Sequence, residues 1–289
     1  MEKIMKNRLR YVGKKLIVLL VAFIFLCPFI VIVCNAFMGN KEMISRYGAV
    51  FLKNPLGFHE AIGGKINISI FPTDWTGEQF YSVLLGSGKY LMKFWNSVLY
   101  TVPIVVAQLS ISCLASYGIT RLKGKKRSII LWIYIVILLL PYQVTLLPNY
   151  IVLNKLQLID SWWAIWLPGF FAPLCVYLIE KFMRRIPKEI VEASMLDGAN
   201  EWSIFMKIYI PLSKSVIWGC CILIFIDYWN MVEQPFWFLR QDSLMPLSIF
   251  LARISDNEIG IAFASAVIYM IPSFLLFQYG EDYFIDGLS

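Results

Sequence analysis

The sequence predicts an all-α polytopic membrane protein with six transmembrane helices. Of its 289 residues, 59% are hydrophobic and 16% are charged, and the mean hydropathy is +0.67; soluble domains carry about 25% charge. The charges are also unevenly placed, because five intervals between neighbouring charges can each hold the roughly 20 apolar residues that cross a bilayer. We therefore expect the chain to span a membrane several times.

Five spans are predicted in these uncharged intervals, and a sixth in an apolar run that contains Asp227 and Glu233. The predicted boundaries are 16–36, 94–118, 128–150, 161–179, 216–238 and 259–279. The first span follows a basic cluster, as a signal peptide does. No small-residue cleavage pattern lies near its end, so we expect a retained anchor.

Basic residues at the ends of spans set the predicted orientation. The N-terminal segment 1–15 carries six of them against one acid, and the second connection carries five and no acid. By the positive-inside rule both segments are cytoplasmic, and with six spans the tail 280–289 is cytoplasmic as well. The loop 37–93 is then an extracytoplasmic lobe, and 94–279 forms the transmembrane core. The net charge of +7 follows from this topology, without a nucleic-acid partner.

Other polar features are interpreted structurally. All six cysteines lie inside the predicted spans, where they serve as small packing residues. His59 is the sole histidine and has no clustered partners for a metal, so we expect it to face solvent. In the outer lobe Thr76, with Gln79 three residues later, predicts the capped start of a short helix.

The segment 180–214 lies between the fourth and fifth spans and predicts a cytoplasmic helical hairpin. Pro187 suits the first position of a helix and Gly198 the position just past its end, so one helix is expected over about 188–196. Asn200 can then cap a second helix.

The second predicted helix ends at Pro211 and places Trp202, Phe205 and Tyr209 near one face. A polar helix with an apolar face has to bury that face. It can enter a groove on a partner protein or lie along the membrane surface, and the periodicity does not decide between them.

The same segment contains a spaced motif: E-A-S, then D-G-A, then I-x-I-P. Its positions are Glu192, Ala193, Ser194, Asp197, Gly198, Ala199, Ile208 and Pro211. This motif resembles the EAA loop of permease subunits from binding-protein-dependent ABC importers, in which E-A-A precedes D-G-A and a spaced I-x-L-P. Ser194 replaces the second alanine and Ile210 replaces the leucine.

The resemblance extends over most of the chain and points to the carbohydrate-uptake type, similar to the second membrane subunit of the maltose importer. Supporting stretches are Asn96-Ser97, Pro141-Tyr142-Gln143-Val144, Trp229-Asn230 and the closing Tyr283-Phe284-Ile285-Asp286-Gly287-Leu288. The chain departs from the pattern at Glu281-Asp282, where a glutamine and a basic residue are usual. It ends at Ser289 without the longer tail of many relatives, so no ATPase contact is carried over to its tail.

The resemblance implies a type I ABC importer permease in a bacterial cell membrane. Its partners would be a sister permease in a heterodimer, two ATP-binding subunits and an extracytoplasmic solute-binding protein. The hairpin would dock in a cleft of the ATPase, with Glu192 facing a basic group, and ATPase closure would rock the spans. We expect no cofactor on this chain, because it lacks a G-x-x-x-x-G-K-[ST] motif; ATP and Mg would be held by the ATPase.

The acids of the fifth predicted span are candidates for the translocation path, since an acid inside a membrane typically faces a cavity or a partner group. The candidate set is Asp227, Tyr228, Trp229, Asn230, Glu233, Gln143 and Asn149. Such residues suit a sugar, because aromatic faces stack on its rings and carboxylates and amides bind its hydroxyls. The alternative, which we favour for substrate contact, is that Glu233 reaches interfacial water and Asp227 pairs with the sister subunit; the amides then bond between helices.

An intramembrane enzyme is not expected. The spans hold no HExxH motif, no serine–histidine pair and no paired aspartates. The function that the resemblance implies is import of a carbohydrate, an oligosaccharide in particular. A permease for glycerol phosphate, phosphonate or peptide is the alternative, and an ATP-independent facilitator, which would not need the hairpin, is a more distant one.

Overall fold

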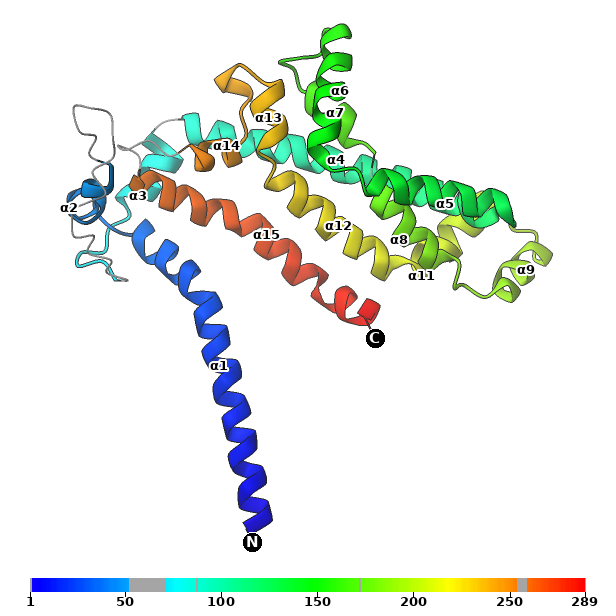
Figure 1. The fold of residues 1–289 in the computed structure, drawn as a ribbon, viewed down its shortest axis with the longest axis horizontal. Coiled ribbons are helices and arrows are strands. Elements are labelled where there is room, and N and C mark those ends of the chain that lie inside the picture. Colours follow the sequence, from blue (N-terminus) through cyan, green and yellow to red (C-terminus); the bar gives the residue numbers. More distant parts are fainter. Residues whose placement is uncertain (1, 52–70, 87, 172, 254–258, 289) are drawn as a thin grey trace. The chain divides into compact units, whose positions relative to one another are not determined.

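The computed structural model of the chain describes residues 2–51, 71–86, 88–171, 173–253 and 259–288, and these are almost entirely helical (Figure 1). Four helical stretches among them are long and apolar enough to cross a membrane: Gly13–Ala36, Gly88–Arg121, Trp163–Met183 and Ile259–Glu281. Two bent helix pairs pass the same test, which gives up to six spans. The predicted fold class is confirmed.

The helices, in chain order, are α1 (Glu2–Ala36), α2 (Asn40–Phe51), α3 (Glu78–Tyr81), η1 (Ser82–Gly86), α4 (Gly88–Arg121), α5 (Lys125–Leu138), α6 (Tyr142–Lys155), α7 (Trp163–Gly169), α8 (Pro173–Met183), α9 (Lys188–Leu196), α10 (Glu201–Ile204), η2 (Phe205–Tyr209), α11 (Ile210–Leu212), α12 (Lys214–Trp229), α13 (Glu233–Phe238), η3 (Asp242–Leu244), α14 (Leu247–Ala252) and α15 (Ile259–Leu288). They form two compact units. Unit 1 comprises Met1–Leu91 and Arg253–Met270, and unit 2 comprises Met92–Ala252 and Ile271–Ser289.

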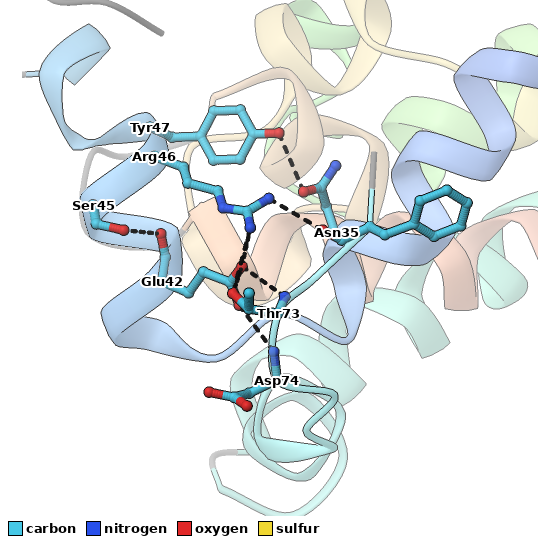
Figure 2. Close-up of polar contacts among 8 residues, drawn as sticks. Asn35, Glu42, Ser45, Arg46, Tyr47, Thr73 and Asp74 are labelled. Atoms are coloured by element: carbon cyan, nitrogen blue, oxygen red, sulfur yellow. Dashed lines mark hydrogen bonds and ion pairs between the residues drawn. The ribbon is translucent and has the colours of Figure 1, made fainter. Parts of the chain in front are cut away.

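The described part of the outer lobe, in unit 1, is held by a polar network around Glu42 of α2 (Figure 2). The Glu42 carboxylate accepts hydrogen bonds from the Thr73 hydroxyl at 2.5 Å and the Thr73 N–H at 2.9 Å, and it pairs with Arg46. The Tyr47 hydroxyl donates to the Asn35 side chain at the end of α1. The Thr73 hydroxyl, more than any other group, holds the pKa of Glu42 below its usual range. His59 lies outside the described residues.

The capping box predicted at Thr76 is wrong. Gly77 is the N-cap of α3 and makes no side-chain cap bond. The Thr76 N–H donates instead to the Phe37 carbonyl at 2.8 Å, and the Gln79 amide donates to the Asn40 side chain at 2.8 Å and to the Met38 carbonyl. Both residues therefore bond to the end of α1 and the start of α2. These partners are distant in the sequence, so the local pattern could not predict them.

A close contact at Gly260, within unit 1, predicts whether a substitution there stabilises or destabilises the protein. A Cβ built on Gly260 of α15 would lie 2.5 Å from the Gln79 side chain, which is buried and held by its hydrogen bonds. Gly260→Ala is therefore expected to destabilise the protein by about 1–3 kcal/mol through overpacking, although helix propensity alone favours alanine. Thermal unfolding of the purified chain in detergent measures it. Gly219→Ala, at a helical glycine with no atom within 4 Å, is the control; equal shifts of the unfolding temperature would contradict the prediction.

The third predicted span, 128–150, is not one straight helix. It is divided into α5 and α6, whose axes meet at 94°. Pro141 stands at the break in an extended conformation, with φ −64° and ψ 142°. A proline has no N–H and disfavours helix in the residue before it, so the helix ends ahead of it.

The fifth predicted span, 216–238, is also interrupted. α12 ends at Trp229, where the Asn230 side chain donates to the Ile226 carbonyl at 2.8 Å, and α13 begins at Glu233. Pro235 could not bond back to the Met231 carbonyl, so a continuous helix would lose that bond. Asp227 thus lies in the last turn of α12, not in the middle of a long span.

The remaining boundaries differ by smaller amounts. The fourth span, predicted at 161–179, is made of α7 and α8 and extends to Met183. The predicted N-terminal segment 1–15 is the start of α1, and the predicted tail 280–289 continues α15 as far as Leu288. Apolar periodicity does not mark the point where a helix leaves the membrane, so helices that continue into water are longer than predicted.

The core of unit 2 forms where α4 crosses α7, α8 and α12. Tyr100 and Ile104 of α4 are fully buried with Ile165 and Ile179. Gly169 permits a close approach, since a Cβ there would lie 2.9 Å from the Ile104 side chain. All six cysteines are free thiols; those at 34, 113, 175 and 220 are buried, as a packing role requires, and Cys27 and Cys221 are half-buried.

Candidate functional site

The hairpin has the predicted local structure. Its first helix, α9, covers Lys188–Leu196, and Pro187 is its N-cap, one position before the one predicted. Gly198 has φ +82°, a left-handed conformation that L side chains adopt rarely. The Asn200 side chain accepts a hydrogen bond from the Ser203 N–H at 2.8 Å, which confirms the second cap.

The second hairpin helix ends at Leu212, one residue after the predicted Pro211. Helical structure continues from Glu201 through α10, η2 and α11 to Leu212, and the axis then turns by 74° into α12 at Ser213. η2 is a π-helical turn directly before the proline. It interrupts the i→i−4 bonding that Pro211 could not complete, so the chain passes the proline within the helix.

The hairpin buries one side against unit 2 and leaves its tip uncovered. Phe205 and Tyr209 are buried, while Trp202, predicted on the same face, is exposed and packs at a tilt against Phe205 with ring centroids 5.5 Å apart. At the tip, Leu196 is 90% exposed and Met195 is also exposed. Within unit 2, α9 lies at one end and α6, α7 and α13 lie toward the other (Figure 1).

The positions of the motif residues are compatible with contact to another protein. Glu192, Ala193, Asp197 and Gly198 are exposed, and Ser194, Ala199 and Ile208 are half-buried. The Ser194 hydroxyl donates to the Val191 carbonyl at 2.7 Å. The carboxylates of this set therefore face outward, where a partner can reach them.

The second site is a cavity of about 470 Å³ at the break between α12 and α13. It is lined by Tyr142, Ile226, Asp227, Tyr228, Asn230, Met231, Val232, Glu233 and Gln234. The lining holds two acids, two amides and two tyrosines but no basic side chain. Among the residues that the structure describes, neither Asp227 nor Glu233 takes part in an ion pair.

The structure gathers part of the predicted path set at this cavity. Asp227, Tyr228, Asn230 and Glu233 line it. Gln143 joins them, because its amide donates to the Glu233 carboxylate at 3.3 Å. Trp229 does not line the cavity. It is 1% exposed and packs against Phe225 and Phe94, and Asn149 also lies outside the lining.

Sequence reasoning did not single out Tyr142 and Gln234 as cavity residues. Tyr142 is the first residue of α6, and Gln234 is in the first turn of α13. Both owe their place in the lining to helix breaks that the hydropathy pattern does not show. The proline at 141 was the available signal for one of them.

A polar face of α4, also missed, fastens the loop that follows α13. Lys93, only 3% exposed, pairs with Asp242 at 2.6 Å, and the Asn96 amide donates to the carbonyls of Ser243 and Met245. The Ser97 hydroxyl accepts from the Leu247 N–H at 2.9 Å. The spacing of these three residues puts them on one face of a helix, which the sequence could have shown. Hydropathy does not indicate which residues they bond.

Asp160 holds the same loop from a second side. Its carboxylate accepts hydrogen bonds from the N–H groups of Arg240 and Gln241 at 2.8 and 3.0 Å and from the Gln241 amide. Burial alone would raise the pKa of Asp160, but these hydrogen bonds hold it below its usual range. The segment beyond α13 is thus a fixed part of unit 2.

These features define a multi-pass membrane transport protein: a helical bundle with a polar cavity at an interrupted span and an exposed hairpin at the other end. No cluster of potential metal ligands occurs among the described residues. The chain belongs to the family described as binding-protein-dependent transport system inner membrane component, which it matches over residues 108–284. It is a permease rather than an enzyme, and proteins of this family work in ABC importers with a partner permease, an ATPase and a solute-binding protein.

Similar proteins include permeases named for several solutes. The chain is 30% identical over 233 residues to the arabinooligosaccharides transport system permease protein AraQ of Halalkalibacterium halodurans, covering 80% of this chain and 84% of the relative. It is 26% identical over 232 residues to the sn-glycerol-3-phosphate transport system permease protein UgpE of Brucella melitensis, covering 76% and 82%.

A solved structure shares the fold. A chain from the crystal structure of a bacterial ABC transporter involved in the import of the acidic polysaccharide alginate matches with a TM-score of 0.77 and 20% identity, covering 96% of this chain and 98% of that one.

Proposed function

We propose that this chain is one of two permease subunits, paired as a heterodimer, of an ATP-driven importer that brings a carbohydrate, an oligosaccharide in particular, across a bacterial cell membrane. A sister permease completes the path, and an extracytoplasmic solute-binding protein delivers the solute. Two ATP-binding subunits hold ATP and Mg and supply the energy. Both termini of the chain are cytoplasmic: the basic clusters predict this for the N-terminus, and six spans return the C-terminus to the same side.

Coupling to the ATPase rests on the hairpin from α9 to α11. Its tip presents exposed apolar side chains, including Leu196 and Met195, beside the outward-facing carboxylates of Glu192 and Asp197. An apolar surface next to acids suits a protein groove with a basic group. It does not suit the membrane surface, because anionic lipids of the cytoplasmic leaflet repel carboxylates. This favours docking over the interfacial alternative.

The proposed solute class rests on the cavity at the break between α12 and α13. Its carboxylates and amides can hydrogen-bond hydroxyls, and the half-buried Tyr142 offers a ring for stacking on a sugar. Glycerol phosphate is the second candidate, because a relative is named for it. A phosphate, however, is normally held by arginine, lysine or a helix N-terminus, and the lining includes two acids and no base.

Reconstitution tests this proposal. The chain is assembled with its sister permease, ATPase and solute-binding protein in liposomes, and uptake of labelled arabinooligosaccharide, lactose and glycerol 3-phosphate is measured with and without ATP. We expect ATP-dependent uptake of an oligosaccharide and none of glycerol phosphate. Uptake that needs no ATP would identify a facilitator, and uptake of the phosphate would overturn the solute class.

Because Asp227 and Glu233 line one cavity, we now favour substrate contact over the alternative preferred from the sequence, and neutralising these acids tests the choice. Asp227→Asn and Glu233→Gln keep the shape of each side chain but remove a charged hydrogen-bond acceptor, which is worth about 1.5–3 kcal/mol. We expect the KM for uptake to rise roughly 10- to 100-fold in each variant. Asn149→Ala, outside the lining, is the control and should keep the wild-type KM. Unchanged uptake in both acid variants would remove these residues from the path.

A further inference from the structure

The end of α4 is joined to the start of the second hairpin helix by a compact polar cluster. Arg121, the last residue of α4, pairs with the Glu201 carboxylate at 2.6 Å. The same guanidinium donates to the Tyr117 hydroxyl at 2.9 Å. That hydroxyl in turn donates to the Glu201 carboxylate and, at 3.3 Å, to the Glu201 carbonyl oxygen. Three groups from two elements therefore bond one another in a closed set.

Aromatic rings pack against this polar cluster. The Tyr117 ring lies 5.1 Å from the ring of Phe205 and 5.0 Å from that of Tyr209, and both partners are buried. The Arg121 guanidinium lies over the Tyr117 ring at 5.1 Å and over the Tyr209 ring at 6.0 Å. The second hairpin helix is thus held on α4 by packing and by an ion pair, along two of its turns.

Covalent connections alone do not give the hairpin such a rigid link. Toward α8 it continues through the short segment 184–187, and toward α12 it passes Ser213, where the axis turns by 74°. α4, by contrast, is one 34-residue helix. It carries the cluster at one end and, nearer the other, Phe94, whose ring packs edge-on against Trp229 at 5.8 Å. Trp229 directly precedes Asn230 in the cavity lining.

We propose that Arg121 and Glu201, seated on Tyr117, act as positioning residues, a latch that makes the second hairpin helix move as one body with α4. A displacement of the hairpin then reaches the cavity along α4, which continues as one helix through Pro103. This inference rests on the proposed function, because the hairpin is displaced by the ATPase. It assigns to α4 the route by which that displacement is passed on.

The latch contributes little to the stability of the fold, so its role is to transmit motion. The Glu201 side chain is 64% exposed, and an ion pair so open to water adds little to stability. The hydrogen bond from the Tyr117 hydroxyl outweighs the partial burial of Glu201 and, with Arg121, holds the pKa of Glu201 below its usual range. Glu201 is therefore ionised at neutral pH, and removing its charge should leave a folded chain.

The test compares transport with ATP hydrolysis in the reconstituted complex. The variants are Arg121→Gln, Glu201→Gln and the exchange Arg121→Glu with Glu201→Arg. Lys207→Gln, which removes an exposed charge from the same hairpin, is the matched control. We expect assembly and basal ATP hydrolysis to be unchanged, and solute transported per ATP to fall about two- to thirtyfold in each single variant. The exchange variant should recover most of the loss, and Lys207→Gln should match the wild type.

Transport per ATP in both single variants equal to that of Lys207→Gln would overturn the latch, as would an exchange variant no better than the singles. Hydrogen exchange on the purified full chain tests the latch without partners. The backbone amides of 201–212 should exchange faster in Glu201→Gln and regain protection in the exchange variant, and unchanged protection would also overturn it. Absence of ATP-driven transport by the wild type would instead count against the proposed function.

Discussion

Gly198→Val will abolish most ATP-driven uptake while the chain remains inserted in the membrane. Gly198 has φ +82°, and a β-branched residue in that region is a genuine outlier that costs about 1–3 kcal/mol. No atom lies within 4 Å of a Cβ built there, so the effect comes from the backbone alone. The turn has to open, which displaces α9 from α10 and shifts the hairpin tip.

The expected loss of uptake is roughly 5- to 150-fold, the range that corresponds to this strain. Uptake and binding-protein-stimulated ATP hydrolysis by the reconstituted complex should fall together. Gly198→Asn should retain much of both, because asparagine tolerates the left-handed region. A complex with Gly198→Val that kept full stimulated ATP hydrolysis would show that the hairpin is not the coupling element.

Gly124→Val is the matched control. Gly124 also has a positive φ, +62°, and open space around its Cβ, but it lies in the turn between α4 and α5. Valine there is also strained, because Gly124 combines its positive φ with ψ −139°, and this strain does not touch the hairpin. We expect less folded protein and normal uptake per folded complex, so a loss of coupling in both variants would trace the effect to strain in general.

The hairpin was predictable because its signals are local. The bounds of α9 and the Asn200 cap follow from capping residues within a few positions of each helix end. The contacts that fix the hairpin to α4 were not predictable. Arg121 and Glu201 are 80 residues apart, and the local sequence around each residue does not indicate that the other is its partner.

The apolar stretches were predictable, but their continuity was not: four helical stretches are long and apolar enough to cross a membrane, and two bent pairs raise the number to six at most. Hydropathy shows whether a stretch is apolar but does not show where the helix axis turns. It therefore merged α5 with α6 across Pro141 and α12 with α13 across Asn230. The second error matters for the site, because the break at the end of α12 forms the cavity. It also separates Trp229, which packs inward, from its neighbours Tyr228 and Asn230 in the lining.

Arg127→Gln will cause the largest loss of stability among these variants. Glu180 of α8 is 0% exposed, and its carboxylate Oε1 accepts a hydrogen bond from Arg127 Nε at 2.7 Å and lies 2.6 Å from Nη2. Among the described residues, no other cation is within ion-pair distance of it. Removing the arginine leaves a buried charge without a partner, at a cost of about 3–5 kcal/mol.

That cost is a large share of the roughly 5–15 kcal/mol that keeps a typical domain folded. Thermal unfolding in detergent and the yield of monodisperse protein should both fall sharply. Arg185→Gln, which removes an exposed arginine two residues beyond the end of α8, should change stability by no more than about 0.5 kcal/mol.

A double variant identifies the cause of the loss. Arg127→Met with Glu180→Leu replaces the pair with apolar side chains of similar size, and such replacements of buried ion pairs are often neutral or stabilising. We expect the double variant to be close to the wild type and far more stable than Arg127→Gln alone. If it is as unstable as the single variant, the arginine stabilises the contact between α5 and α8 by its packing and not by compensating the Glu180 charge.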